Sequence, residues 1–194
     1  IISGAVMKLW GRDDSLPVLA MIPVNLRSLY GTKTMSNFSD GIFLPYDRRT
    51  ASGSLERQAL ILRAKMDLQI QSENFDSAMA GKIGTVKNFM ASGKNAWDLS
   101  RELTDLSQPP GFNFMTYACT YPGQLEFCTD AVKHASILIC VRQSIPFGAF
   151  MAAYGDEFRI TLSHSFEGTA IAEEVRSRIE ALNIDAAIQD VGYM

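Results

Sequence analysis

The stretch Val18-Leu19-Ala20-Met21-Ile22-Pro23-Val24 is a continuous apolar run of strand length. A run of this kind predicts a β-strand that is buried on both faces. Pro23 has no N–H group to donate to a sheet ladder, so we expect it at a sheet edge, at a bulge or at the end of the strand. The segments on either side of this strand indicate what surrounds it.

An amphipathic helix precedes the strand. Ile2, Val6, Leu9 and Trp10 recur at helical spacing and form one apolar face. No capping residue stands before this helix, so we expect it to begin before residue 1 and the chain to be part of a longer protein. A polar turn rich in Asp, Gly and Ser, residues 11–17, separates the helix from the strand.

A second strand and a long helix follow. The sequence predicts a loop over residues 25–40, a short strand over 41–45 and a break over 50–54. Ser54 is an expected N-cap, and Glu56 places a carboxylate in the first turn, where the helix dipole favours it. The apolar face of this helix is formed by Leu55, Ala59, Leu62, Met66 and Ile70. Weaker helical signals continue over residues 75–106, interrupted by Gly81, Gly84 and Gly93, and Pro109-Pro110-Gly111 ends them.

The last third is rich in strand signals. Strands are expected over residues 112–121 and 136–141, and over two segments, 147–154 and 158–163, that flank the turn dipeptide Gly155-Asp156. A helix with one apolar face follows over residues 171–182 and stops around Asn183. The order of elements predicts an α/β fold for residues 1–194 as a single lobe, a mixed sheet covered by helices on one side.

Composition narrows the classes of function. The net charge is −3 and the sequence pI is about 5.4, so no basic field favours nucleic acid or an anionic membrane. Apolar runs are too short to span a membrane. The three cysteines, Cys119, Cys128 and Cys140, lack C-x-x-C spacing, so we expect reduced thiols in a cytoplasmic protein, with no disulfide framework and no zinc site. Phosphate-binding glycine motifs and metal-ligand spacings are also absent.

Four stretches resemble, in their order and spacing, the C-terminal half of the chloramphenicol acetyltransferase-like superfamily, which includes condensation-domain and alcohol acetyltransferase-like proteins. They are the opening helix with the strand that ends at Arg27, the segment Thr34 to Phe38 that leads into Ile42 to Leu44, the segment Thr116 to Gly123, and the hairpin Phe147 to Phe166 with the helix after it. Residues 47–110 match only in their helical character.

The resemblance implies a two-lobed enzyme with an acyl-donor tunnel between its lobes. The donor is acyl-coenzyme A or an acyl group on a carrier-protein pantetheine arm, and it is a substrate rather than a bound cofactor. In this family a His-His-x-x-x-Asp-Gly motif supplies the base, because a histidine can both accept and return a proton near neutral pH. That motif does not occur in this sequence. We therefore expect it in an N-terminal lobe outside this chain, and we expect the chain alone to be inactive.

The sequence contains two histidines, and one of them, His164, is an alternative candidate for the base. His164 lies in Ser163-His164-Ser165-Phe166-Glu167-Gly168, at a strand end before a helix. The setting is similar to that of the catalytic histidine of single-lobe acetyltransferases. Ser163 precedes it instead of a second histidine, and Glu167 follows at the third position instead of an Asp at the fourth. Catalysis by His164 would need a trimer to complete the site. His134 lies in a polar stretch and is expected to be solvated or capping.

The resemblance also suggests residues that line the tunnel. Arg27 is expected either to brace its loop or to contact a phosphate of coenzyme A. Ser36 and Asn37 either line the tunnel or bond their own backbone. Thr120 and Tyr121, at a strand end, are expected to face the tunnel, although packing alone also explains a buried tyrosine.

The sequence thus predicts one lobe of an acyltransferase that moves an acyl group from a thioester to a hydroxyl or amine. Its expected partners are its own N-terminal lobe, a small-molecule acceptor and a carrier protein. Two alternatives stay open: a non-catalytic interaction lobe with the same fold, and the trimeric enzyme that uses His164. The lobe interpretation further predicts an exposed apolar surface where the second lobe binds.

Overall fold

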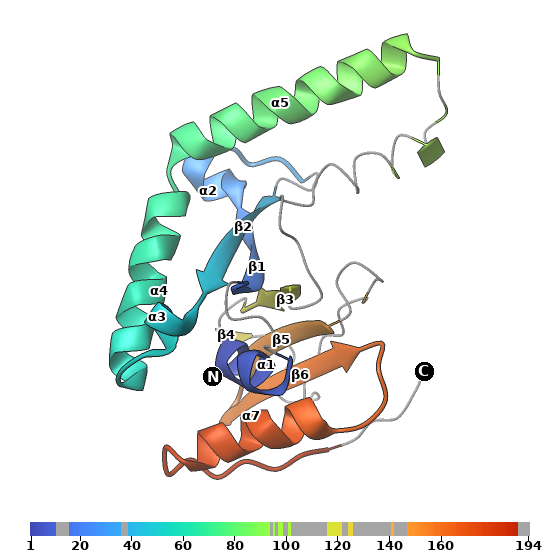
Figure 1. Cartoon of the computed structure of the whole chain (residues 1–194). Helices are drawn as coiled ribbons and strands as arrows, with labels where there is room; N and C mark the ends of the chain where they lie inside the picture. The colour runs from blue at the N-terminus through green and yellow to red at the C-terminus, as the bar shows by residue number, and fades with distance from the viewer. Residues whose placement is uncertain are drawn as a thin grey trace.

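A computed structural model describes residues 1–10, 16–35, 39–93, 95, 97–98, 101, 116–121, 124–125, 141 and 147–189. The helices and strands, in chain order, are α1 (Ile2–Trp10), β1 (Val18–Asn25), α2 (Leu26–Tyr30), β2 (Ser39–Tyr46), α3 (Arg48–Ala51), α4 (Leu55–Gln69), α5 (Ser72–Ala91), β3 (Thr116–Thr120), β4 (Gln124–Leu125), β5 (Phe147–Tyr154), β6 (Glu157–His164) and α7 (Ala170–Glu180). Figure 1 shows their arrangement.

The described strands form one mixed sheet in the order β2-β1-β3-β5-β6. The inner strands β1, β3 and β5 are parallel, and the outer strands β2 and β6 are antiparallel to their neighbours. The short β4 also pairs with β5, at Ala153 and Tyr154, beyond the residues that pair with β3. Since β6 pairs with β5 along its whole length, β3 and β4 share the other edge of β5. The predicted α/β mixed sheet is confirmed.

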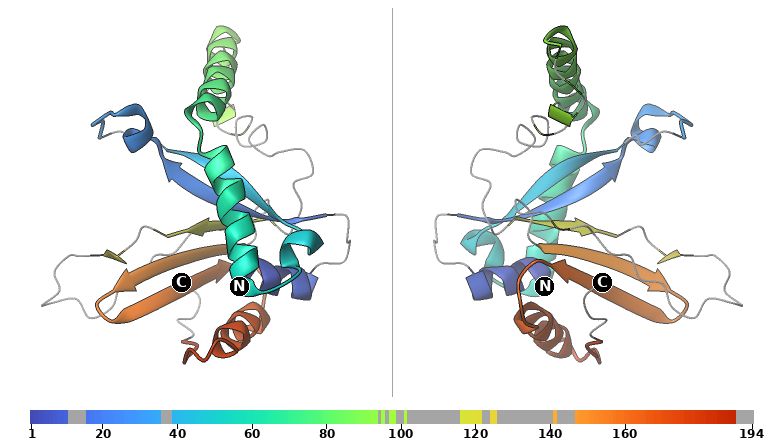
Figure 2. Two further views of the ribbon diagram at one scale, coloured as in Figure 1. Left: turned by 90° about the vertical axis from the view of Figure 1, so that its left-hand side faces the viewer. Right: turned by 90° about the vertical axis from the view of Figure 1, so that its right-hand side faces the viewer.

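The main core lies between one face of the sheet and the helices α1 and α7, which lie side by side in Figures 1 and 2. Alternation along the strands turns every second side chain to this face. Its buried members from the sheet are Val18, Ala20, Ile42, Leu44, Tyr46, Tyr117, Cys119, Phe147 and Ala149, and from the helices Ile2, Ala5, Val6, Ile171 and Val175.

The opposite face of the sheet is not bare. Phe150 and Tyr154 of β5 point to that face by strand alternation, yet both are buried, with 8% and 6% of their surface exposed. The expected helical cover on one side describes the placement of α1 and α7, while the second face is also buried at Phe150 and Tyr154.

Helix α4 runs along the free edge of β2 and closes it. The side-chain amide of Gln69 accepts a hydrogen bond from the Phe43 N–H at 3.1 Å and donates one to the Phe43 carbonyl at 2.7 Å. Lys65 donates to the Pro45 carbonyl at 2.8 Å. These bonds satisfy backbone groups that an outer strand otherwise presents to other chains. Ser54 caps the helix by accepting from the Arg57 N–H, as predicted.

Helix α5 continues through Gly81 and Gly84, although the sequence predicted interruptions there. Contacts over residues 75–82 offset the low helix propensity of glycine. Phe75 is buried, Tyr30 donates to Asp76 at 2.6 Å, and Lys82 forms an ion pair with Asp40. Gly93, with φ of 72°, follows the helix end.

Two further expectations were incomplete. The predicted loop over residues 25–40 contains the short helix α2, which the Asn25 side chain caps by accepting from the Arg27 N–H. The predicted break over residues 50–54 overlaps α3, which Asp47 caps by accepting from the Thr50 N–H. The predicted strand 136–141 lies outside the described residues except for Val141.

The C-terminal hairpin and helix agree with the prediction. β5 and β6 flank Gly155-Asp156, where Gly155 has φ of 56°, and α7 is followed by Asn183 with φ of 59°. Pro23 pairs with Gly41 of β2 and lies beyond Met21, where the pairing of β1 with β3 ends. Its missing N–H group therefore leaves no gap in the ladder between β1 and β3.

Candidate functional site

The carboxyl ends of β1 and β3 lie at one end of the sheet. Both strands are parallel, and their register places Leu19 opposite Thr116 and Met21 opposite Ala118. Arg27 follows the end of β1, while Thr120 ends β3 and Tyr121 comes next. In open α/β sheets, ligands bind outside the carboxyl ends of the strands. The topology therefore brings three of the residues predicted from sequence to the end of the sheet where a ligand is expected.

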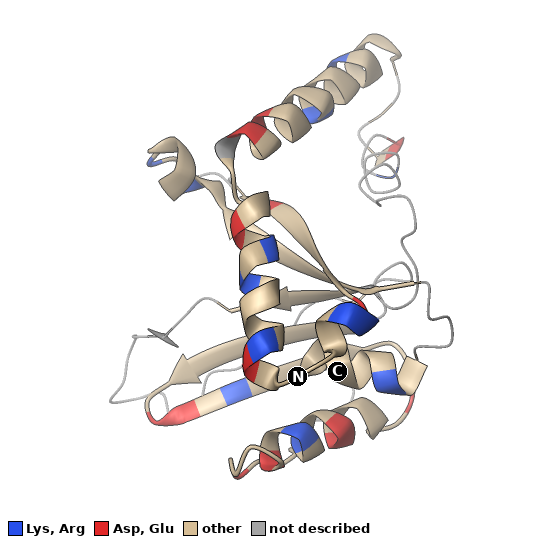
Figure 3. Ribbon diagram, turned by 60° about the vertical axis from the view of Figure 1, so that its left-hand side comes forward, with Lys and Arg blue, Asp and Glu red and all other residues tan. Residues whose placement is uncertain are grey.

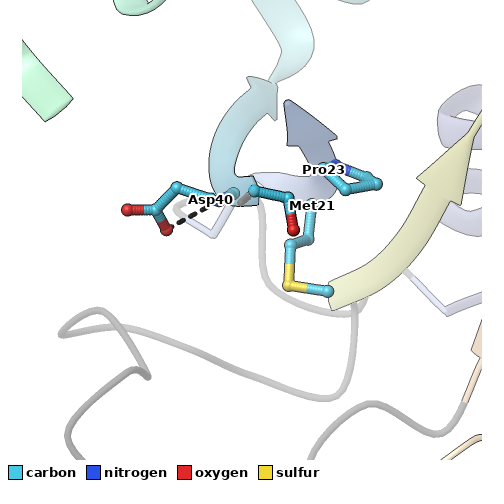
Figure 4. A pocket seen from close by; sticks show the side chains of 5 residues that line it. Met21, Pro23 and Asp40 are labelled. Carbon is cyan, nitrogen blue, oxygen red and sulfur yellow. Dashed lines mark hydrogen bonds between the residues drawn. The ribbon is translucent and has the colours of Figure 1, made fainter. Parts of the chain in front are cut away.

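A hollow of about 270 Å³ lies at this end of the sheet, beside β1 and β2. It is lined by Met21 and Pro23 of β1 and by Ser39, Asp40 and Gly41 of β2. Figure 4 shows the side chains of Met21 and Pro23 at the hollow, and the carboxylate of Asp40 turned away from them. That carboxylate accepts from the Gly41 N–H at 2.8 Å and pairs with Lys82, so the hollow itself is mainly apolar.

The size of this hollow and the charge of its described lining limit what it can hold. Its volume lies below the roughly 300–1,000 Å³ typical of sites that enclose a whole small-molecule ligand. Lysine and arginine are absent from the lining given above, and Figure 3 shows charged residues mainly on the helices and near the turn between β5 and β6. A small, uncharged segment of a ligand therefore fits the described lining better than a phosphate group, which needs cationic or N–H donors.

Arg27 is bound to its own loop. Its Nε–H donates to the Thr34 carbonyl at 2.8 Å, and its Nη1–H donates to Asn25 Oδ1 at 3.2 Å. The guanidinium fork thus joins the end of β1 to the segment that leads toward β2. This is the bracing geometry, one of the two roles that the sequence predicts for Arg27.

The other predicted tunnel residues are placed differently. Thr120 is half-buried, and strand alternation turns it to the face that carries the hollow, away from the core side of Tyr117. Tyr121 is 52% exposed, and its ring lies 5.9 Å from that of Phe158. Ser36 and Asn37 lie outside the described residues, as does Phe38 after them. The next residue in the sequence, Ser39, lines the hollow.

His164 lies at the other end of the sheet. β6 is antiparallel to β5, so His164 is opposite Phe147, the first residue of β5. Its Nδ1 lies 2.6 Å from the Phe166 carbonyl, and its ring stacks on Phe166 at 4.3 Å. A carbonyl only accepts, so Nδ1 carries a proton and donates it in this hydrogen bond. Phe166 in turn meets Trp10 at 4.9 Å, which makes this cluster part of the packing between α1 and β6.

His134 and two of the cysteines, Cys128 and Cys140, also lie outside the described residues. Cys119 is a buried free thiol on β3, and burial raises its pKa to about 11. A thiol that stays protonated at neutral pH is a poor nucleophile and a poor metal ligand. Within the described ranges, His, Cys, Asp and Glu form no cluster of three or more suited to a metal ion.

Sequence reasoning missed Met21, Pro23 and Gly41 as site residues. Gly41 was a detectable signal, because a glycine inside a strand often marks a place where a ligand or another backbone approaches closely. A Cβ atom at this position would lie 3.6 Å from Met21 Cγ, which is an ordinary contact distance. Larger side chains at position 41 would occupy the hollow.

Comparison of the chain with models of protein families, with curated proteins and with solved structures found no match. Helices among the described residues are too short or too polar to cross a membrane.

Proposed function

We propose that this chain forms one lobe of an acyltransferase whose acyl donor is a thioester of coenzyme A or of a carrier-protein pantetheine arm. The observation that carries this proposal is the small, mainly apolar hollow beside the carboxyl end of β1 and the first residues of β2. Ser39, which lines the hollow, comes two residues after the segment Ser36-Asn37 that the resemblance assigns to the donor tunnel. The hollow also lies on the face of the sheet to which Thr120 points.

In this proposal the hollow receives the pantetheine or acyl part of the donor, and the phosphates lie elsewhere. Pantetheine is a thin chain with amide groups, and such a chain suits a hollow that is smaller than a complete ligand site. Among the residues described at this end of the sheet there is no histidine to act as a base. The lobe supplies walls, and a base from a second lobe removes the acceptor proton as the acceptor attacks the thioester carbonyl. The C–S bond then breaks, and the thiolate takes up the proton.

The exposed apolar side chains on α4 and α5 form a surface that a second lobe could cover. Leu60 and Leu68 of α4 are 66% and 71% exposed, and Met90 of α5 is 74% exposed. Leu60, Ala64 and Leu68 are four residues apart, so they form one stripe on the side of α4 that is turned away from the core residues Leu62 and Met66. Large exposed apolar side chains in a row are typical of a protein interface.

The interpretation that uses His164 as the base has weaker support. His164 and the hollow lie at opposite ends of the parallel strands, so one chain does not bring them together. That enzyme would need a second subunit to place its own hollow beside His164.

A methyl NMR titration tests the donor site. The chain is labelled at its methionine methyl groups and titrated with pantetheine, coenzyme A and acetyl-coenzyme A. We expect the Met21 signal at the hollow to shift, while the signal of Met151, which packs against the core, stays in place. Pantetheine and coenzyme A should bind with similar affinity, because the hollow contacts the part that they share.

Substitutions of two glycines provide the matched control. Gly41→Leu places a side chain in the hollow and should abolish the Met21 shift, whereas Gly81→Leu adds the same side chain in open space on α5 and should leave it unchanged. A Met21 signal that none of the three ligands moves at millimolar concentration would overturn the proposal. A shift that persists in Gly41→Leu would also place the binding elsewhere.

A further inference from the structure

The two outer strands of the sheet differ in how their free edges are covered. The edge of β2 is closed by Gln69 and Lys65 of α4, as described above. Along β6, residues 158–163 have no backbone hydrogen-bond partner other than β5 within the described part of the chain. One edge of the same sheet is thus protected and the other is left available.

The hairpin geometry shows which backbone groups of β6 are available. A two-residue loop, Gly155-Asp156, joins the pair Tyr154 and Glu157, and such a loop closes on a hydrogen-bonded pair. Hydrogen-bonded and non-hydrogen-bonded pairs alternate along an antiparallel ladder. The N–H and C=O groups of Phe158, Ile160 and Leu162 therefore point away from β5.

This edge lacks the features that protect outer strands from pairing. Such strands are commonly short, or carry a proline, a bulge or an unpaired charge. β6 spans eight residues without a proline and pairs with β5 in unbroken register. Its cation, Arg159, is neutralised by Glu157 at 2.8 Å. Phe158 at one end of the edge is 58% exposed.

We propose that a second copy of this chain binds along β6, antiparallel, with Ile160 of each copy at the twofold axis. In this register Phe158 lies opposite Leu162 of the second copy, and Ile160 lies opposite its own counterpart. All three residues with outward backbone groups then pair with one another, and their side chains continue one apolar face across the interface.

The register also places no like charges directly opposite each other. Arg159 lies directly opposite Thr161 of the second copy, and Glu157 lies directly opposite Ser163, so no two like charges are directly opposite each other. The two copies of Arg159 are diagonal neighbours across the axis, and each forms an ion pair with Glu157 of its own chain. A twofold interface uses the same strand on both copies, and it therefore needs no surface beyond the one that each chain already presents. The apolar stripe on α4 and the hollow beside β1 stay free, so this inference does not depend on the proposed function.

Sedimentation velocity of the chain over a range of micromolar concentrations tests this inference. We expect a dimer of twice the 21.4 kDa chain mass that dissociates on dilution. Phe158→Lys places a charge at the exposed end of the edge and should raise the dissociation constant at least tenfold, since Leu162 of the second copy would then face an ammonium group. Ile184→Lys makes the same kind of change at a residue that is 54% exposed outside the sheet, and it should leave the dimer intact.

Hydrogen exchange provides a readout that does not depend on how a variant folds. The amides of Ile160 and Leu162 in the unmodified chain should exchange more slowly as its concentration rises and the dimer forms. A chain that stays monomeric over the whole range overturns the inference. A dimer whose Ile160 and Leu162 amides exchange as fast as in the monomer also overturns it, because the contact would then lie on another surface.

Discussion

The hydroxyl groups of Ser3 and Tyr117 lie 2.8 Å apart inside the core and join α1 to the central strand β3. Ser3 is 7% exposed and Tyr117 is 4% exposed, so both residues are shielded from bulk water. Each hydroxyl therefore uses the other as its hydrogen-bond partner. This bond connects residues that are 114 positions apart in the sequence. A buried hydroxyl without a partner costs free energy, and this makes the pair a sensitive probe of how α1 is held.

Tyr117→Phe is expected to lower the free energy of unfolding by about 1–3 kcal/mol, because it leaves the Ser3 hydroxyl buried and unsatisfied. Urea unfolding followed by circular dichroism measures the change. The double variant Ser3→Ala with Tyr117→Phe removes both polar groups and should recover part of the loss. Equal stability of the single and double variants would contradict a partnered role for Ser3.

Gln69→Leu is expected to destabilise the fold by about 1–2 kcal/mol, because the N–H and C=O groups of Phe43 lose their bonds at the edge of β2. Urea unfolding again gives the measurement. Gln71→Leu, two residues later, removes only an exposed bond to the Asp67 carbonyl and should change stability by less than about 0.5 kcal/mol. Similar losses in both variants would mean that the edge bonds carry no special weight.

The free energy of unfolding is expected to fall as the pH rises above about 9, which is the ordinary pKa of a thiol. Burial raises the pKa of Cys119 to about 11 and also raises that of Tyr117. The folded state therefore keeps protons that the unfolded state loses, so unfolding becomes more favourable by up to about 1.4 kcal/mol per pH unit for each group. The stabilisation is fully present below these unfolded-state pKa values.

The contribution of Cys119 is separable from that of Tyr117. Cys119→Ala should reduce the fall in stability between about pH 9 and pH 10, where the unfolded thiol but not the unfolded phenol is largely deprotonated. The readout is the slope of the urea midpoint against pH, which is independent of any constant loss caused by the smaller side chain. An unchanged slope in Cys119→Ala would show that the thiol does not cause this pH dependence.

Arg27→Lys separates the bracing role of this residue from a contact with phosphate. Lysine keeps the charge but loses the fork that bonds both Thr34 and Asn25. We expect a loss of about 0.5–1.5 kcal/mol in unfolding free energy and no change in the ratio of coenzyme A to pantetheine affinity. The control is Arg63→Lys on the exposed side of α4, which should be neutral. A selective loss of coenzyme A binding in Arg27→Lys would instead indicate a phosphate contact.

Local signals in the sequence were sufficient for several elements. Ser54 caps the N-terminus of α4, Gly155-Asp156 joins β5 to β6, and Asn183 follows the end of α7. These features were predictable because capping and turn chemistry act over a few neighbouring residues. Asn25 and Asp47 cap α2 and α3 in the same way, so those two short helices were detectable from the same type of signal.

Only the tertiary structure decided how these elements combine. Packing of Phe75 and the bonds of Asp76 and Lys82 hold α5 as one helix through two glycines, against its local propensity. The parallel register of β1 and β3 brings Arg27 and Thr120 to one end of the sheet, and the reversed direction of β6 carries His164 to the other. Capping and turn signals act within a few residues, whereas strand order and register depend on contacts between distant segments, so the sequence pattern alone did not specify which candidate residues would share a site.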